Sequence, residues 1–413
     1  MTRRHRQLLL LAALGICAGL ATLAVVRAAA FDSSVQTAHT IRVVRVAPAG
    51  ELASVQVRVS SWRATDRCRI TVDGKVRGIS RDRRFGLTRP LAAGRHTLTA
   101  TFVRDGEAAA VSTPVRFRMP RPAVTGARIA AAGDIACDPE IHTRRPPQGL
   151  APGNCQQETT AAVVSTIAPR AVLALGDTQY GCPTLKTMRR GYGTSWGRFL
   201  RITHAVPGNH EYIGDPELDC RSKSATAYFA YFGSRAGPPG KGWYSFDLAG
   251  WHLVALNSAC SDVGGCGPGS PQLEWLQQDL AAHPSTCLLV YWHRPRWEPT
   301  RSGEPDDVRL DGFWRASVAA GADVILHGDA HMYARSRLLN ASGVVASKGV
   351  RDFVVGTGGR SLVTGEPRAA RYAVSQGREF GAIRVTLGAG RYAWQFVPAA
   401  GGHFTDYGTG TCS

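Results

Sequence analysis

Hydrophobic and polar residues alternate along residues 41–120, and this period of two predicts an all-β segment. The stretches "IRVVRVAP", "SVQVRVSSW", "CRITVDGKV", "HTLTATFVRDG" and "VSTPVRFRMP" all show it, with turns such as "DGK" and "AAGR" between them. Short, evenly spaced strands predict an immunoglobulin-like sandwich over residues 31–120. The segment holds no cluster of titratable residues, so we expect a spacer or adhesion role there. The stretch "MPRPAVTG" that follows predicts a linker.

From residue 121 onward the pattern changes, and apolar runs alternate with helical stretches. "ETTAAVVSTIA" predicts one helix. A second is predicted after Ser270, because a capping residue precedes Pro271 and leucines at 273, 276 and 280 share one face. Strands that alternate with helices indicate an α/β domain, which we place at residues 121–413.

The first thirty residues have the pattern of a targeting segment. The basic "TRRHR" precedes an apolar stretch over residues 8–26, and small residues follow near Ala30. This predicts a cleaved signal peptide at residues 1–30. A retained signal anchor is the alternative, because residues 8–26 are just long enough to span a membrane. Both interpretations predict a protein that is secreted or held in the cell envelope.

The cysteines agree with an oxidising compartment. Removing Cys17, in the predicted signal peptide, from the ten cysteines leaves nine, and none of these forms a CxxC pair. We therefore expect disulfides, with one thiol left over. Cys68 lies far from the others and is predicted to be that thiol. Cys260 and Cys266 flank the short loop "SDVGG" and are predicted to form a disulfide, whereas the other pairings stay open.

The formal net charge is +18, and arginine supplies most of the positive charge. A basic surface attracts polyanions, among them an anionic cell envelope. Basic stretches interleaved with aromatic residues, as binders of single-stranded nucleic acid require, do not occur. We therefore expect no specific nucleic-acid recognition, and most of the arginines are predicted to lie on solvated faces.

Five apolar runs of the α/β segment end in side chains able to bind a metal. Because the carboxyl ends of strands in an open α/β sheet face one crevice, we expect these side chains to converge. Taken singly, a Gly-Asp pair is usually a turn and a lone histidine a core residue. The runs and the residues that they deliver are "RIAAAGDIAC" with Asp134, "AVLALGDTQY" with Asp177 and Tyr180, "THAVPGNHEY" with Asn209 and His210, "CLLVYWHRP" with His293, and "DVILHGDAH" with Asp329 and His331.

Two further motifs fit other chemistry less well. "GTSWG" matches the nucleophile elbow of serine hydrolases at Ser195, but the polar, basic "KTMRRGY" before it is not the buried strand that an elbow requires. "VVGTGGRS" lacks the Gly-Lys-Ser/Thr of a phosphate-binding loop, which favours close backbone approach to the crevice instead. His327 is predicted to pack at a strand end rather than to bind a metal.

The five motifs together resemble those of the calcineurin-like metallophosphoesterases, and among them the purple acid phosphatase branch. That branch has D-x-G, G-D-x-x-Y, G-N-H-[DE], V-x-x-H and G-H-x-H, and this chain has "DIA", "GDTQY", "GNHE", "VYWH" and "GDAH" in the same order. The resemblance implies a two-sheet sandwich flanked by helices, with two metal ions at its edge. A β-sandwich before the catalytic domain is also similar to the plant-type architecture of this branch.

The resemblance also implies a role for each residue. His210 would be the acid that protonates the leaving group. Apart from the resemblance, the position of Arg294 next to His293 predicts a contact with the substrate phosphate, with a surface arginine as the alternative. Glu211 would either orient His210 or be a solvated loop carboxylate. The implied ligands are Asp134, Asp177, Tyr180 and His331 for metal 1, and Asp177 as the bridge with Asn209, His293 and Asp329 for metal 2.

The chain departs from the common family pattern at two places. Ala136 stands where most members have a metal-binding histidine, and Tyr180 supplies a phenol instead. A phenolate with two carboxylates favours trivalent iron at metal 1. Asp329 stands where the first histidine of G-H-x-H is expected, so metal 2 gains a hard oxygen donor. This favours manganese, magnesium or ferrous iron over zinc there; a weakened second site is the alternative.

The function expected from this resemblance is hydrolysis of phosphate esters, with phosphomonoesters favoured, by attack of a metal-bound hydroxide. The alternatives are a phosphodiesterase or nucleotide hydrolase of the same fold, and a catalytically weakened binding protein of the envelope. The sequence leaves the physiological substrate and the oligomeric state open.

Overall fold

The computed structural model describes residues 39–49, 52–87, 91–120, 122, 124–139, 155–215, 220, 224–284, 287–300, 305–365, 368 and 370–413. The predicted signal peptide or anchor at residues 1–30 lies outside these residues. Within them, no helix has both the length and the apolar character needed to cross a membrane.

Residues 41–119 form an all-β unit, as the alternating pattern predicted. One sheet has the strand order β1-β2-β5, and the other has β4-β3-β6-β7 with β8 added to β6. Side chains of both sheets, such as Val57 and Phe102, share one core. The strands are β1 (Ile41–Ala49), β2 (Leu52–Val59), β3 (Arg67–Val72), β4 (Lys75–Ser80), β5 (Arg84–Gly86), β6 (Gly94–Arg104), β7 (Glu107–Val111) and β8 (Val115–Met119).

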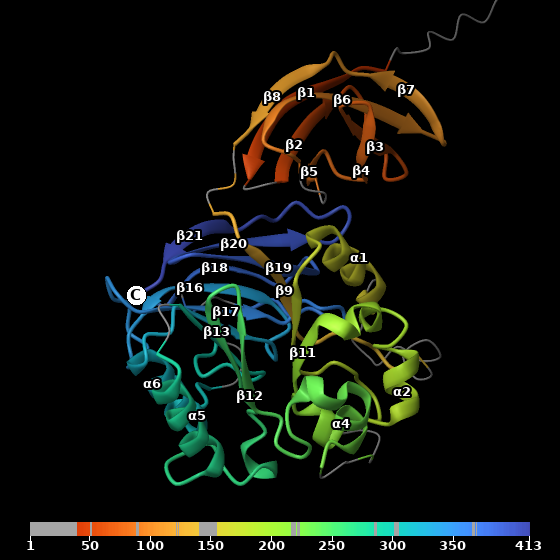
Figure 1. The fold of residues 1–413 in the computed structure, drawn as a ribbon. Helices are drawn as coiled ribbons and strands as arrows, with labels where there is room; N and C mark the ends of the chain where they lie inside the picture. Colours follow the sequence, from red (N-terminus) through yellow and green to blue (C-terminus); the bar gives the residue numbers. More distant parts are fainter. Residues whose placement is uncertain are drawn as a thin grey trace, which may run out of the picture. The chain divides into compact units, whose positions relative to one another are not determined.

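Two larger sheets build the rest of the described chain, which confirms the predicted sandwich (Figure 1). The six-stranded sheet has the order β11-β10-β9-β19-β20-β21. Its strands are β9 (Ala127–Ala132), β10 (Ala171–Leu175), β11 (Thr203–Val206), β19 (Gly381–Gly388), β20 (Arg391–Pro398) and β21 (Tyr407–Thr411).

The seven-stranded sheet has the order β12-β13-β14-β15-β17-β16-β18. Its central strands are buried on both faces: Leu289 points into the core between the sheets, and its neighbour Val290 points to the helices outside. This is why these strands read as unbroken apolar runs. The strands are β12 (Tyr244–Leu248), β13 (Trp251–Ala255), β14 (Leu288–Tyr291), β15 (Val324–His327), β16 (Tyr333–Leu339), β17 (Val350–Val355) and β18 (Tyr372–Gln376).

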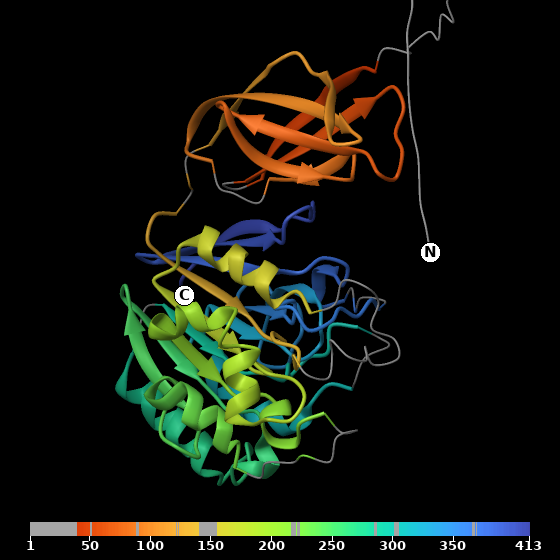
Figure 2. The same ribbon diagram turned by 90° about the vertical axis from the view of Figure 1, so that its right-hand side faces the viewer.

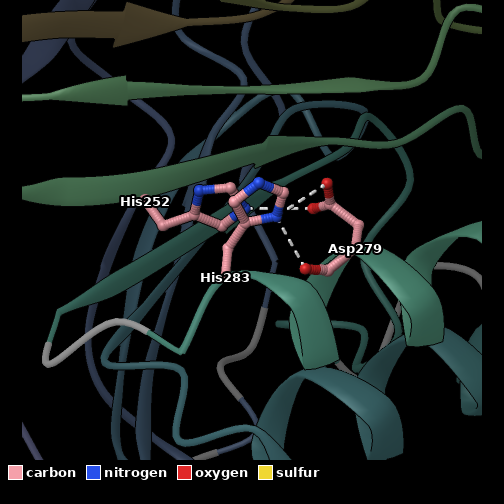
Figure 3. Close-up of side chains that lie close together, drawn as sticks. All are labelled: His252, Asp279 and His283. Carbon is pink, nitrogen blue, oxygen red and sulfur yellow. Dashed lines mark hydrogen bonds and ion pairs between the residues drawn. The ribbon is translucent and has the colours of Figure 1, made fainter.

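Helices flank the two sheets (Figures 1 and 2). The predicted helix after Ser270 is confirmed: the Ser270 side chain caps it, and Leu273 and Leu276 pack on the sheet. Its other end, at Asp279 and His283, lies against His252 of β13 (Figure 3). The helices are α1 (Gln157–Ile167), α2 (Leu185–Arg190), α3 (His210–Ile213), α4 (Thr226–Phe232), α5 (Pro271–Ala282) and α6 (Asp311–Ala319), with 3-10 turns η1 (Trp196–Ile202), η3 (Gly233–Ala236), η4 (Cys260–Asp262) and η5 (Val308–Leu310).

Four disulfides link the described cysteines, which indicates an oxidising compartment. The predicted pair Cys260–Cys266 is confirmed, and Cys68 is the free, buried thiol that was predicted. The pairings that the sequence left open are Cys137–Cys155, Cys182–Cys220 and Cys287–Cys412.

Candidate metal centre

The five motifs converge at the carboxyl ends of strands, but these strands belong to two sheets rather than to one. β9, β10 and β11 are parallel neighbours in the six-stranded sheet, and β14 and β15 are parallel neighbours in the seven-stranded sheet. This agrees with the two-sheet sandwich that the resemblance implied. The site lies where the strand ends of two packed sheets meet, so each sheet supplies one side of it.

One group of side chains gathers around the Tyr180 hydroxyl. This hydroxyl donates a hydrogen bond to Asp134 Oδ1 at 2.8 Å and lies 2.8 Å from His331 Nε2. The other ring nitrogen of His331 lies 2.6 Å from Ser361 Oγ, which fixes the ring. A carboxylate, a phenol and an imidazole from three strand ends therefore point at one small volume.

A second group gathers around His293. Its Nε2 lies 3.3 Å from Asp177 Oδ1 and 3.4 Å from Asp329 Oδ1. Its Nδ1 lies 2.7 Å from the Leu175 carbonyl, which can only accept, so Nδ1 carries the proton in the neutral ring and Nε2 offers a lone pair to the site. Asn209 starts the turn that carries His210, and the His210 backbone N–H donates to Asp177 Oδ1 at 2.9 Å.

The backbone is strained at this centre. Four residues of the two groups have positive φ angles: 60° at Asp134, 46° at Asp177, 66° at Asp329 and 47° at His331. A left-handed conformation is costly for residues with a side chain and persists where the surroundings hold it, which is common at functional sites. The conformation turns these side chains away from their own strands and toward the shared volume.

His210 lies at the edge of the two groups, with a partner that the sequence did not reveal. Its Nδ1 is 3.0 Å from Asp215 Oδ1, and its Nε2 is 3.8 Å from Asp177 Oδ2. The ring packs against that of Tyr180, with 4.3 Å between centroids. Burial lowers the pKa of His210, but the Asp177 charge and the Asp215 contact outweigh burial, so its pKa is raised overall. A proton on this ring is therefore stabilised.

Glu211 does neither of the two things expected of it. The side chain is buried, 1% exposed, so it is not a solvated loop carboxylate. Its oxygens accept hydrogen bonds from the backbone N–H groups of Asp177 and Thr178 and from Gly208 N–H at 2.6 Å. Glu211 therefore ties the loop after β10 to the loop after β11, whereas Asp215 is the carboxylate at the His210 ring.

Charges in the two groups shift each other's proton affinity. Burial raises the pKa of Tyr180 first, and the Asp134 and Asp177 carboxylates raise it further, well above its ordinary value. Burial lowers the pKa of His293, but the negative charge of Asp177 outweighs burial and holds this pKa well above the ordinary value of a histidine. Without a cation, protons on the phenol and the imidazole balance the carboxylates of this centre.

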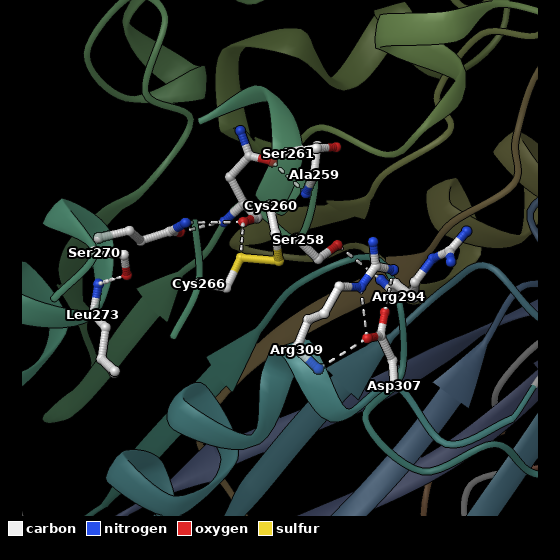
Figure 4. Close-up of a disulfide and its surroundings, with 12 residues drawn as sticks. Ser258, Ala259, Cys260, Ser261, Cys266, Ser270, Leu273, Arg294, Asp307 and Arg309 are labelled. Carbon is white, nitrogen blue, oxygen red and sulfur yellow. Dashed lines mark hydrogen bonds and ion pairs between the residues drawn. A yellow bond between two sulfur atoms is a disulfide. The ribbon is translucent and has the colours of Figure 1, made fainter. Parts of the chain in front are cut away.

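Arg294 lies at the rim. Its Nε is 3.9 Å from Asp329 Oδ2, and its backbone N–H donates to Ser258 Oγ at 3.0 Å. Ser258 precedes the Cys260–Cys266 loop, and Figure 4 shows this disulfide beside Arg294. A cleft of about 270 Å³ opens here, with polar and charged lining side chains; they include Arg294, Glu298, Asp306, Asp307, Arg309 and Asp329.

The side chains fit metal binding by an independent criterion. Asn209 Oδ1 is buried and has no hydrogen-bond partner among the described residues, and the buried His293 Nε2 faces the carboxylate oxygens of Asp177 and Asp329. Orphaned buried polar atoms are rare and demand an explanation such as a bound ion. Ligand atoms of Asp134, Asp177 and His293 also lie within 4.8 Å of one another. Carboxylate, phenol, amide and imidazole donors at this spacing suit divalent or trivalent cations.

The structure also shows what the remaining motifs do. His327 is fully buried, with Nε2 2.9 Å from Asp352 Oδ1, so it packs at the strand end as predicted. The Ser195 hydroxyl is buried and donates to backbone carbonyls, which excludes a nucleophile elbow. The "VVGTGGRS" loop approaches the centre closely, since a Cβ at Gly356 would lie 2.6 Å from His331 N.

That loop brings two residues that sequence reasoning missed. Ser361 contacts the His331 ring, and the Arg360 guanidinium lies 4.9 Å from the centre of the Tyr180 ring. Both follow β17, beyond the last of the five motifs. The only signal in the sequence was the glycine-rich run itself, which indicated close approach without naming these side chains.

Comparison with known proteins agrees with this geometry. The family model of the calcineurin-like phosphoesterases matches residues 127–333, the range that carries all five motifs. The chain belongs to this family. Membership in this family agrees with the metal-competent side chains that the structure brings together.

Two relatives place this calcineurin-like phosphoesterase near the purple acid phosphatases. Purple acid phosphatase 23 of Arabidopsis thaliana is 30% identical over 157 residues, which are 35% of this chain and 33% of that protein. The chain thus matches about a third of the length of that curated relative. The structure of a purple acid phosphatase from seeds of yellow lupin (Lupinus luteus) aligns with this chain at a TM-score of 0.53 and 16% sequence identity. The alignment covers 89% of this chain and 73% of the lupin chain, and it shows that the two share a fold.

Proposed function

We propose that this protein is a secreted phosphatase that uses two metal ions to hydrolyse phosphomonoesters. The observation that carries the proposal is the buried Asn209 Oδ1, which has no hydrogen-bond partner among the described residues, beside His293 Nε2 and the convergent carboxylates. Two cations at such a site neutralise the phosphoryl charge and lower the pKa of a bound water. The proposed ligands are Asp134, Asp177, Tyr180 and His331 for one ion, and Asp177, Asn209, His293 and Asp329 for the other.

The chain's own residues provide the rest. Asp177 reaches both groups, which suits it to bridge two ions. His210, with Asp215 on its far nitrogen and Asp177 near its Nε2, is held where it can donate a proton to a leaving oxygen. Arg294, at the wall of the cleft beside Asp329, is placed to contact phosphate oxygens or the leaving group.

Donor chemistry supports a metal assignment. Tyr180 and two carboxylates make a hard, anionic donor set, which favours iron in the trivalent state at metal 1. Oxygens of Asp177, Asn209 and Asp329 outnumber the His293 imidazole at metal 2, which favours manganese, magnesium or ferrous iron, with zinc as a weaker competitor. Residues 31–120 are proposed to be a non-catalytic β domain and residues 121–413 the catalytic domain.

The test is metal removal and reconstitution with a chromogenic phosphomonoester as substrate. Verified chelation is expected to abolish hydrolysis, and iron with a divalent cation to restore it.

Tyr180→Phe is expected to lose the charge-transfer colour of a ferric phenolate. Ser195→Ala is the matched control and keeps activity. Full activity after exhaustive metal removal overturns the proposal, and preference for a chromogenic diester favours the phosphodiesterase alternative.

A further inference from the structure

A second group of metal-competent side chains lies at the other end of the seven-stranded sheet. His252 of β13 is paired in register with Leu288, the first residue of β14, whereas His293 lies two residues beyond Tyr291, the last residue of β14. Asp279 lies in the last turn of α5, and His283 follows its final residue. Figure 3 shows both histidine rings beside the Asp279 carboxylate. This group shares no residue with the centre at Asp177.

The three donors are spaced as ligands of one ion. His252 Nε2 lies 3.0 Å from Asp279 Oδ2, and His283 Nδ1 lies 3.4 Å from Asp279 Oδ1. Neighbouring donors around a tetrahedral zinc ion, at bond lengths of about 2.0–2.1 Å, lie about 3.3 Å apart. All three ligand atoms fall within 4.8 Å of one another.

The hydrogen-bond partners of His252 direct its Nε2 at Asp279. His252 Nδ1 is 2.8 Å from Asp247 Oδ1, and an ionised carboxylate only accepts, so Nδ1 carries the proton. In the neutral ring Nε2 is then an acceptor that faces another acceptor, Asp279 Oδ2. The two repel unless a proton or a metal ion lies between them. A histidine that donates to a carboxylate on one side and binds metal on the other is a common arrangement in metal sites.

Charge balance points the same way in this basic chain. The carboxylates of Asp247 and Asp279 form ion pairs with these two histidines, and among the described residues no arginine or lysine pairs with either. A divalent ion held between the three donors would offset the negative charge of the Asp247 and Asp279 carboxylates.

We propose that His252 Nε2, the Asp279 carboxylate and a ring nitrogen of His283 bind a divalent transition cation of the zinc type, with Asp247 as the positioning residue behind His252. Two imidazoles and one carboxylate with a fourth position for water suit zinc. His252 and Asp279 are 3% and 7% exposed, whereas His283 is 48% exposed, so His283 can exchange its contact with the Asp279 carbonyl for the ion. The ion would clamp α5 to β13.

The experiment uses tag-free protein whose catalytic centre is already loaded and from which loose metal has been removed. Zinc bound per chain is measured by equilibrium dialysis against buffered zinc. Wild type is expected to take up one more equivalent than His283→Ala or Asp279→Asn, and Asp247→Asn to weaken this uptake by about 10- to 100-fold. His403→Ala is the matched control, because His403 is also half exposed (49%) and pairs with a single carboxylate, Glu379.

Three readouts separate this site from the catalytic one. Phosphatase activity is expected to stay unchanged in His283→Ala, and zinc is expected to raise the melting temperature of wild type and His403→Ala but not of His283→Ala. Cobalt substituted for zinc should give a ligand-field spectrum that disappears in His283→Ala. Equal zinc uptake by wild type and His283→Ala overturns the proposal and leaves the group as a protonated ion-pair cluster.

Discussion

At the scale of single residues, the side chains of the centre differ in role because they have different hydrogen-bond and ion-pair partners. His210 is close to Asp177 but is held by Asp215, so its ring stands beside the ligands rather than among them. Asp329 faces His293 at 3.4 Å and Arg294 at 3.9 Å, which puts its carboxylate between the centre and the cleft. These two residues carry the sharpest predictions.

His210→Ala is expected to keep both metal ions and to lose about 100- to 10,000-fold in turnover with poor leaving groups, the usual scale for a positioned acid. The loss should shrink as the leaving group becomes more acidic, because a good leaving group needs no proton. Asp215→Asn should show the same dependence with a smaller loss, since it orients the ring only. Steady-state kinetics on a series of aryl phosphates measures this, and a loss equal for all leaving groups contradicts the acid role.

Asp329 is predicted to set the metal preference of metal 2. Asp329→Ala should empty metal 2 first, because Asp134, Tyr180 and His331 still hold metal 1. Asp329→His adds a nitrogen donor and should raise zinc affinity relative to manganese. Metal stoichiometry and reconstitution series on the three proteins measure both effects. Two ions bound by Asp329→Ala at unchanged affinity show that Asp329 is not a ligand.

At the scale of elements, the turns that follow the strands position the side chains of the centre. Glu211 joins the turns after β10 and β11 through backbone N–H groups, and glycines let these turns come close. A Cβ at Gly208 would lie 2.1 Å from Asp177 Oδ1 and 2.8 Å from His293 Cδ2. The turn after β11 therefore requires glycine at position 208, because a side chain there would overlap Asp177 and His293.

Gly208→Ala is accordingly expected to displace the Asp177 carboxylate and to lower turnover by about 100-fold, the cost of a misplacement near 1 Å. Metal content should fall with it, while the sheets stay folded. Gly267→Ala is the matched control, because a Cβ there meets nothing within 4 Å. Activity, metal content and the circular dichroism spectrum of the two variants are compared. An unchanged activity in Gly208→Ala would contradict the prediction, because the turn would then have shifted without moving the Asp177 carboxylate.

At the scale of the whole molecule, one disulfide connects the two sheets that form the site. Cys287 precedes β14 of the seven-stranded sheet, and Cys412 follows β21 of the six-stranded sheet. The two cysteines are 125 residues apart, whereas Cys260 and Cys266 are 6 apart. A cross-link over a longer loop removes more entropy from the unfolded chain.

Replacing Cys287 and Cys412 together by serine is expected to lower the free energy of unfolding by about 4–5 kcal/mol, and replacing Cys260 and Cys266 by about 2 kcal/mol. Urea unfolding of the metal-free proteins measures the difference. Because the second pair lies beside Ser258 and Arg294, its loss should affect the Michaelis constant more than the first pair's loss does. Equal destabilisation by the two replacements contradicts the loop-length explanation.

The sequence by itself determined the apolar runs that form strands, the motifs at the ends of five of them, the capped helix after Ser270 and the unpaired Cys68. These features depend on local chemistry: a strand needs an apolar run, a turn needs glycine, and a metal needs oxygen and nitrogen donors. The family followed from the order of the motifs, and Tyr180 with Ala136 indicated a resemblance to its purple acid phosphatase branch.

Only the tertiary structure decided which groups meet. Asp215 reaches His210, Ser361 reaches His331, and Glu211 turns inward to backbone N–H groups, because two sheets pack face to face and bring distant loops together. The cluster of His252, Asp279 and His283 was invisible for the same reason: helix periodicity places Asp279 and His283 on one face, but only the packing of α5 on β13 adds His252. Contacts between elements depend on how the whole chain packs, and that information is not present in any single stretch of residues.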